Sequence, residues 1–318
     1  MKTEEYLLKD QLSIDISKIE LPEIEQSEIE IIDEYVEFTR HFQEIDQLFH
    51  IFQVNMKQLL LHYELLVDDT IIKKDKIDIE ESDEIIINAL FINYISSSRT
   101  FIESIEVFLK KRLGETEYQN YKNIYLSPIY DKEFSYRFLY SLRNYSQHGH
   151  LPVHVDFNNK CSFDLNELLN TPHFDHNAKL KVELNEIREC IIKKFKDNPR
   201  IMFTRTIAEF QIVIFEIYEL FINYIFERLI FLKNKINKCI EKNPNIIYKS
   251  NDMFDGYIMY KIKDKNVHCF NPNDDPVEMM ENIRENVIFK LNDLRNEFDN
   301  IFKMKKIKKV RYKNNRED

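Results

Sequence analysis

Three residues near the middle of the chain have side chains that together can process a phosphodiester: Arg143, Asn144 and His148. Histidine titrates near neutral pH and can take or give a proton. Arginine stays charged, and its forked donors match two phosphate oxygens. RNA cleaves when its 2′-hydroxyl attacks the adjacent phosphate, which requires a base, charge stabilisation and alignment but no metal or cofactor. We therefore expect His148 to act as general base or acid, Arg143 to stabilise the phosphorane, and Asn144 to orient the phosphate or the imidazole.

A helix is expected to carry these residues at its carboxyl end. Asp131 is predicted to cap its start, Gly149 suits the left-handed position after its end, and Pro152 prevents it from resuming. Its apolar residues recur at spacings of four, four and three and predict a buried face: Phe134, Phe138, Leu142 and Tyr145. A plainer interpretation is that Arg and His here only stabilise the helix dipole, by up to about 1 kcal/mol.

The geometry of a regular helix limits what these residues do together. At 3.6 residues per turn, Asn144 and His148 share a face, whereas Arg143 and His148 lie about 140° apart. A single helix therefore brings Arg143 and His148 to one point only if its last turn is distorted or a second copy of the chain contributes.

The pattern of an Arg, a polar residue directly after it and a His five positions after the Arg resembles the signature of HEPN-superfamily ribonucleases. The resemblance covers this helix and a plausible preceding one. It implies a helical bundle that forms a homodimer through the motif helices and cleaves RNA at a composite, metal-independent site. It further implies a toxin, abortive-infection or antiphage role, with a possible antitoxin or regulatory partner. In one branch of the family a Tyr follows the His by two residues, where this chain has His150.

Other residues are expected to support the site. The helix predicted over residues 84–113 has a polar stretch in its middle that includes Asn93 and Arg99. Polar residues of the preceding helix support the site in HEPN proteins, so we expect Arg99 and Asn93 to do so here, together with Tyr145 and His150. A solvated helix face would explain the same stretch without any function.

Two rival interpretations remain open. A group of imidazoles and carboxylates could chelate a divalent ion, although neither an HExxH nor a CxxC motif accompanies them: His148, His150, His154, Asp156, His173, Asp175 and His176. Alternatively, the chain could be a non-catalytic helical scaffold that binds RNA or protein. The sequence contains no glycine-rich phosphate loop and no nucleophile elbow, and we expect no cofactor.

Composition supports a mainly α-helical fold. Of 318 residues, 43% are hydrophobic, while only 3 are glycine and 8 proline, which favours long helices over a sheet with many tight turns. The four cysteines have no paired spacing and the chain begins without an apolar signal region, so we expect reduced thiols in the cytoplasm. The longest apolar run, residues 212–232, contains four charged side chains, so no membrane span is expected: Glu216, Glu219, Glu227 and Arg228.

Charge is distributed unevenly along the chain. The net charge is −10, but residues 1–34 carry 3 Lys against 11 acidic residues, and residues 303–318 carry 8 basic residues against 2 acidic ones. The basic end could attract phosphate and the acidic end could cover a basic site, while two solvated ends are the simpler interpretation.

The expected organisation has three parts: an acidic arm and amphipathic helix over residues 1–82, a HEPN-like antiparallel bundle over 83–243, and an accessory region over 244–318 with a hairpin, a helix and the basic tail. Residues 1–34 could be a strand, an irregular arm or a partner-binding segment, and the first clear helix spans 37–66. A charged linker follows over 67–83. Within the bundle a short hairpin spans 151–163, and helices are predicted over 177–195 and 198–242. Asn198 would cap the second of these and Pro199 would occupy its first position. A hairpin over 246–270 and a helix from Pro276 complete the chain.

Overall fold

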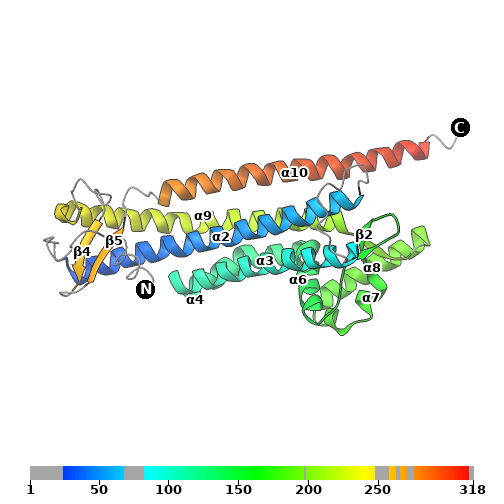
Figure 1. The fold of residues 1–318 in the computed structure, drawn as a ribbon, viewed down its shortest axis with the longest axis horizontal. Helices are drawn as coiled ribbons and strands as arrows, with labels where there is room; N and C mark the ends of the chain where they lie inside the picture. Colours follow the sequence, from blue (N-terminus) through cyan, green and yellow to red (C-terminus); the bar gives the residue numbers. More distant parts are fainter. Residues whose placement is uncertain are drawn as a thin grey trace. The chain divides into compact units, whose positions relative to one another are not determined.

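The computed structural model describes residues 24–67, 82–196, 198–247, 258–262, 266–270 and 276–314, with side chains left out at 65–67, 259–262, 266–270 and 302–314 (Figure 1). Most of the predicted acidic arm, the linker and the side chains of the basic tail lie outside this description. The elements are α2 (Gln26–Val67), α3 (Asp83–Arg112), α4 (Glu115–Tyr121), the π-helical η2 (Lys122–Leu126), α5 (Ser127–Lys132), α6 (Phe134–Gln147), β1 (His154–Val155), β2 (Cys161–Asp164), α7 (Leu165–Leu169), the 3₁₀ turn η3 (Pro172–Phe174), α8 (Ala178–Phe195), β3 (Arg200–Met202), α9 (Phe203–Lys242), the 3₁₀ turn η4 (Pro244–Ile246), β4 (Ile258–Ile262), β5 (Asn266–Phe270) and α10 (Pro276–Asn314). The prediction of a mainly α-helical fold is confirmed.

The chain divides into two compact units. One unit combines Met1–Thr39 with Phe226–Met279, and the other combines Arg40–Ile225 with Met280–Asp318. Both are discontinuous in sequence.

In the first unit, the beginning of α2 and the end of α9 are held together by buried apolar and charged side chains. Glu28 is 6% exposed and accepts hydrogen bonds from Lys242 (2.9 Å) and from Asn243 (3.1 Å). The apolar part of this core comes mainly from the same two helical segments: Ile29, Ile32, Tyr35, Leu229, Leu232 and Ile236. The helix therefore begins at Gln26 rather than near residue 37, because its acidic first turns bury an apolar face.

An antiparallel hairpin of β4 and β5 belongs to the same unit. Ile258 pairs with Phe270 and Ile262 with Asn266, as the predicted hairpin over 246–270 requires. Ile246 is in η4 instead of a strand, and Ile247 forms an isolated bridge with Ile258. The start of α10 at Pro276 is also confirmed.

Aromatic side chains fill the core of the second unit. The Phe49 ring of α2 contacts Phe101 of α3 at 5.3 Å and Tyr218 of α9 at 4.3 Å between ring centroids. Phe91 of α3 packs on Phe163 of β2 and on Phe203 of α9. These contacts join α2, α3 and α9 in one core. Helix α6 packs against α3.

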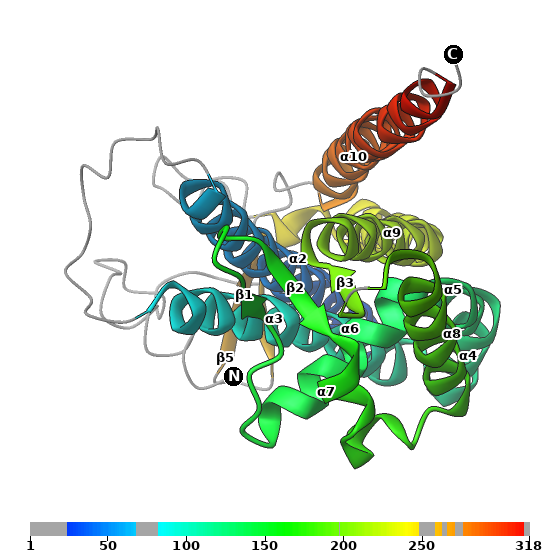
Figure 2. The ribbon, with the colours of Figure 1, turned by 90° about the vertical axis from the view of Figure 1, so that its right-hand side faces the viewer.

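Helix α6 lies between α3 and α8, with α7 and the small sheet beside it (Figure 2). Its predicted apolar face is buried at Phe138, Leu142 and Tyr145. Arg137 is also buried, at 1% exposed, and donates to Glu183 of α8 at 2.6 and 2.8 Å. The same guanidinium donates to the backbone carbonyl of Asp131 at 2.6 Å, which fixes the turn before the helix.

The predicted cap of α6 by Asp131 is wrong. Asp131 lies inside α5, and Glu133 occupies the N-cap position without a side-chain hydrogen bond. The chain from α4 through η2 to α5 is helical almost to the start of α6, so the break falls at Glu133, whose backbone is extended.

A three-stranded antiparallel sheet in the order β1-β2-β3 follows α6. His154 pairs with Ser162, which confirms the short hairpin predicted over residues 151–163. The expectation that Asn198 and Pro199 begin a helix is wrong, because Arg200–Met202 forms β3 and pairs with β2 before α9 starts at Phe203. Asn177 does cap α8, accepting from the Leu180 amide at 3.0 Å.

One helix of the described chain, α3, is long and apolar enough by length and composition to cross a membrane. Its buried residues include Phe91, Tyr94 and Phe101, which contact aromatic rings of the surrounding core. A helix in a protein core can meet the same two criteria, so the length and apolar composition of α3 are not by themselves evidence of a membrane span.

Candidate functional site

His148 lies just outside the helix that carries Arg143 and Asn144. Helix α6 ends at Gln147, and His148 is its C-cap with φ −92° and ψ 16°. Gly149 then adopts φ +87°, the left-handed conformation expected for it, and donates to the Ser146 carbonyl at 3.1 Å. The turn leaves the imidazole of His148 exposed to solvent.

Arg143 lies beside a second guanidinium. It is half-buried, it donates to the side-chain oxygen of Gln147, and its Nε is buried without a hydrogen-bond partner. Burial, followed by the positive charge of Arg99, lowers the pKa of Arg143, which nevertheless remains charged at neutral pH. The negative charge of Glu103 acts on the pKa of Arg143 in the opposite direction.

Arg99 connects α3 to the motif residues. It donates from Nη1 to Asn144 Oδ1 at 3.2 Å, and from Nε to Glu103 at 2.7 Å. Its guanidinium carbon also lies 4.4 Å from the ring centre of Tyr140, at cation–π distance. Arg99, Tyr140 and Arg143 line part of a small hollow between α3 and α6. The structure thus brings Arg99, Asn144 and Arg143 together.

Three histidines and a tyrosine form an aromatic cluster at the end of α6. The ring of His148 stacks on His173 of η3, with centroids 4.5 Å apart and planes 24° apart. His150 stacks on Tyr145 at 4.4 Å and 17°. His173 also meets Tyr145 edge-on at 5.9 Å and His150 at 5.4 Å. We call Tyr145, His148, His150 and His173 the aromatic cluster.

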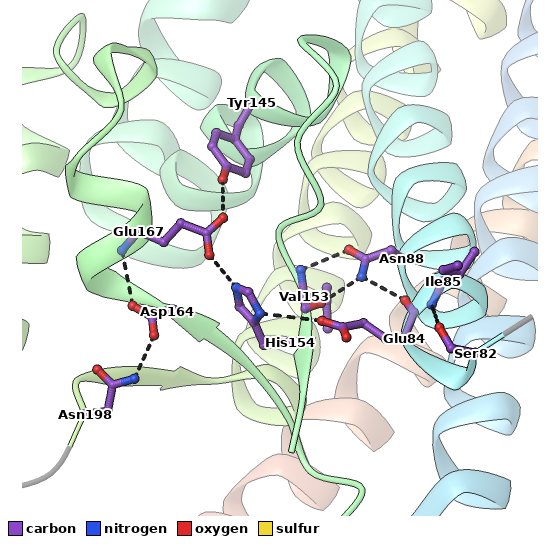
Figure 3. Close-up of polar contacts among 10 residues, drawn as sticks. All are labelled: Ser82, Glu84, Ile85, Asn88, Tyr145, Val153, His154, Asp164, Glu167 and Asn198. Atoms are coloured by element: carbon purple, nitrogen blue, oxygen red, sulfur yellow. Dashed lines mark hydrogen bonds and ion pairs between the residues drawn. The ribbon is translucent and has the colours of Figure 1, made fainter. Parts of the chain in front are cut away.

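A series of hydrogen bonds and ion pairs connects Tyr145 of the aromatic cluster to Glu167, His154 and Glu84 (Figure 3). The Tyr145 hydroxyl donates to Glu167 Oε1 at 2.8 Å, and the other Glu167 oxygen lies 2.6 Å from His154 Nε2. His154 Nδ1 is in turn 3.5 Å from Glu84 Oε1. Burial, and then the hydrogen bond to Glu167, raise the pKa of Tyr145, so its hydroxyl remains a donor.

Local backbone contacts fix the residues of this series. Asp164 caps α7 by accepting a hydrogen bond from the Glu167 amide at 3.2 Å (Figure 3). This cap fixes the start of α7 and therefore the position of Glu167. The side chain of Asn88, fully buried on α3, accepts from the Val153 amide at 3.0 Å and donates to its carbonyl at 2.7 Å. Val153 directly precedes β1, so this clamp positions His154.

The predicted site residues therefore form two groups. Arg143 and Asn144 lie with Arg99, whereas His148 lies with His150, His173 and Tyr145. In the described part of the chain, no recorded interaction joins Arg143 to His148, as the 140° offset between them predicts. Asn93 is exposed on α3, and nothing recorded among the described residues connects it to α6.

The predicted metal ligands do not converge. Among the described residues, no group of three or more His, Cys, Asp or Glu side chains is placed to hold a metal ion. His148 and His173 stack face to face, and His154 pairs with Glu167. The described cysteines Cys161, Cys190 and Cys239 are free thiols.

Sequence reasoning did not single out Glu167, which lies 22 residues after Tyr145 and in a different helix. No helical or strand spacing connects the two positions. The sequence places His173 only among several possible metal ligands.

No protein-family model, no curated protein and no solved structure matches this chain.

Proposed function

We propose that this protein is a metal-independent endoribonuclease of the HEPN type, which cleaves RNA by attack of the 2′-hydroxyl on the adjacent phosphate. The observation that supports it best is that Arg99 and Arg143 line the same small hollow, with Arg99 bonded to Asn144, close in sequence to the exposed imidazole of His148. These are the positive charge and the proton-transfer group that the reaction needs.

Each group has a chemical task in this proposal. Arg143, which stays charged, donates hydrogen bonds to the phosphate and stabilises the phosphorane. Arg99 fixes the Asn144 amide through its hydrogen bond, so Asn144 orients the phosphate. His148 moves a proton, and its exposed position lets a large polymer reach it.

The active form in this proposal is a homodimer. Arg143 and His148 have separate neighbours in one chain, so a complete site combines Arg143 of one copy with His148 of the other across a twofold axis. Uncontrolled RNA cleavage is toxic, so such an enzyme suits a cytoplasmic toxin or antiphage effector controlled by a partner.

An RNase assay with and without EDTA tests the proposal. The purified protein should cleave single-stranded RNA, and the rate should survive chelation. Loss of cleavage on chelation would instead support a metal-dependent site, and no cleavage under any condition would support the non-catalytic scaffold. A contaminating nuclease is controlled for by purifying His148→Ala in parallel.

A further inference from the structure

We propose that His173 is a second proton-transfer residue of the site, acting as the general base while His148 acts as the general acid. This inference rests on the proposed function and extends it, since cleavage of RNA by the 2′-hydroxyl needs both a group that removes a proton and a group that supplies one. The three motif residues, Arg143, Asn144 and His148, contain only one imidazole.

The position of His173 carries the inference. Its ring stacks on His148 with 4.5 Å between centroids and a tilt of only 24°, so the two imidazoles lie in direct contact at the end of α6. Two imidazoles held in this way can contact the 2′-oxygen and the 5′-oxygen of one phosphodiester, each over a hydrogen bond of about 2.6–3.2 Å. His173 is half-buried and His148 exposed, so both reach solvent.

His150 is the other histidine of the aromatic cluster, but its contacts are different. It stacks on Tyr145 at 4.4 Å and touches His173 edge-on. The ring contact recorded for His148 is with His173. His150 therefore supports the cluster, and His173 is the partner of His148.

The electrostatic surroundings suit the two roles. Burial, followed by the nearby histidines His148, His150 and His176, lowers the pKa of His173. A histidine with a lowered pKa is neutral at neutral pH, which is the form that accepts a proton. In this scheme His148 supplies the proton that the leaving group needs.

The reaction balances with these two residues. Neutral His173 removes the proton of the 2′-hydroxyl while the 2′-oxygen forms a bond to phosphorus. The bond from phosphorus to the 5′-oxygen breaks, and protonated His148 gives its proton to that oxygen. The products are a 2′,3′-cyclic phosphate and a 5′-hydroxyl, with His173 now protonated and His148 neutral. Exchange with water restores both.

Tyr145 and Glu167 are positioning residues in this scheme. The edge of Tyr145 meets His173 at 5.9 Å, and Glu167 fixes the Tyr145 hydroxyl at 2.8 Å while pairing with His154. The series shown in Figure 3 thus sets the tyrosine against which His173 packs.

Substitution of His173 tests the inference. His173→Ala and His173→Phe should each lower kcat at least about a hundredfold, the usual worth of one acid–base group. Phenylalanine keeps an aromatic ring in the stack but transfers no proton, and melting temperatures check that both variants fold. His50→Ala, which removes an exposed histidine of α2 that contacts Asp46 of its own helix, is the control and should change kcat by less than about twofold. Cleavage by folded His173→Phe at the wild-type rate would overturn the inference.

A modified substrate separates the two roles. In an oligonucleotide with a single ribonucleotide linkage, replacing the bridging 5′-oxygen by sulfur gives a leaving group that needs no proton. This substrate should restore most of the rate to His148→Ala and none to His173→Phe. The reverse pattern would overturn the assignment of base and acid. If wild-type protein cleaves while His173→Phe is undiminished, only this inference fails, whereas absence of cleavage by wild type overturns the proposed function as well.

Discussion

At the scale of single residues, the end of α6 keeps a positive group and a titratable ring on different sides of the chain. Arg143 is still helical and turns toward Arg99, while His148 has left the helix as its C-cap. A histidine at this position could serve only the helix dipole, for about 1 kcal/mol or less. Stability and activity measurements distinguish that role from proton transfer, because the dipole contributes to the first and not to the second.

His148→Ala and Arg143→Ala should each reduce RNA cleavage at least about a hundredfold, the usual effect of removing one acid–base or charge-stabilising group. The double variant should lose little more than either single one, because groups that act as a unit are non-additive. Each variant should remain folded, with a stability loss of about 1 kcal/mol. Turnover, melting temperature and the chemistry of the RNA ends measure these effects.

Two outcomes would contradict this prediction. One is a folded His148→Ala protein with the wild-type rate, and the other is a product with a plain 3′-hydroxyl instead of a 2′,3′-cyclic phosphate. His50→Ala provides a control, since His50 is exposed on α2 and contacts Asp46 of its own helix.

At the scale of elements, the placement of α6 depends on a buried charge that the amphipathic pattern does not reveal. Arg137 lies among buried neighbours, with its side chain 2% exposed, and pairs with Glu183, whose side chain is 27% exposed. The pair joins α6 to α8, and the same guanidinium satisfies backbone carbonyls at the end of α5. Removing one partner of such a pair leaves an uncompensated charge and unsatisfied acceptors.

Arg137→Ala should therefore lower the free energy of unfolding by about 3 kcal/mol or more. Arg205→Ala is the matched control, because Arg205 pairs with Glu209 four residues on, at the surface of α9, and such pairs contribute below about 1 kcal/mol. Urea denaturation of both variants gives the comparison. Equal losses of unfolding free energy in the two variants would show that the α6–α8 ion pair stabilises the protein no more than the surface pair on α9 does.

The sequence was most informative where local spacing decides the structure. The buried face of α6 and the positive φ of Gly149 both follow from short-range rules. The sequence was least informative where contacts between distant segments determine the structure. Pro199 favours a helix start by itself, but pairing with β2 makes the next residues a strand. The acidic segment that the sequence leaves unassigned forms the first turns of α2, where Glu28 accepts a hydrogen bond from Lys242.

The candidate site divides in the same way. The placement of Arg143 and Asn144 at the end of one helix could be predicted from spacing, whereas His148, expected in the last turn, lies just outside the helix as its C-cap. The ring contact between His148 and His173, and the bond from Tyr145 to Glu167, could not, because the chain between them folds into a sheet and a short helix. Such contacts depend on tertiary packing, which residue types alone do not encode.

At the scale of the whole molecule, the proposed site needs two copies of the chain. If Arg143 of one copy works with His148 of the other, a heterodimer of Arg143→Ala with His148→Ala contains one intact site and one empty site. Co-expression with two different tags and purification of the mixed species should recover about half of the wild-type rate. If both residues act within one chain, the mixed species should be as inactive as its parents.

Stability in acid should depend on Glu28. Hydrogen bonding from Lys242, the largest cause, lowers the pKa of Glu28 below its ordinary value near 4.3. The folded state therefore holds the ionised form more tightly than the unfolded state does. This contribution is complete above pH of about 4.3 and is lost as pH falls through the lower, folded-state pKa.

Unfolding free energies measured from pH 7 to pH 3 should show this loss in wild type, and Glu28→Gln should show a shallower decline over the acid part of the range. Lys242→Met should flatten the decline as well, since it removes the cause of the shift. An identical slope in all three proteins would rule out a role for this ion pair in acid stability.

The pairing of Glu28 with Lys242 also has a consequence for the nascent chain. The two residues are 214 positions apart. A ribosome adding about 5–20 residues per second needs roughly 11–43 s to cover that separation. During that time Ile29, Ile32 and Tyr35, which are buried in the finished protein, wait for the segment of α9 that completes their core. Translation speed and chaperone supply should therefore affect correct folding of this unit more than formation of the α3–α6 contact. The two helices of that contact leave the ribosome close together in time.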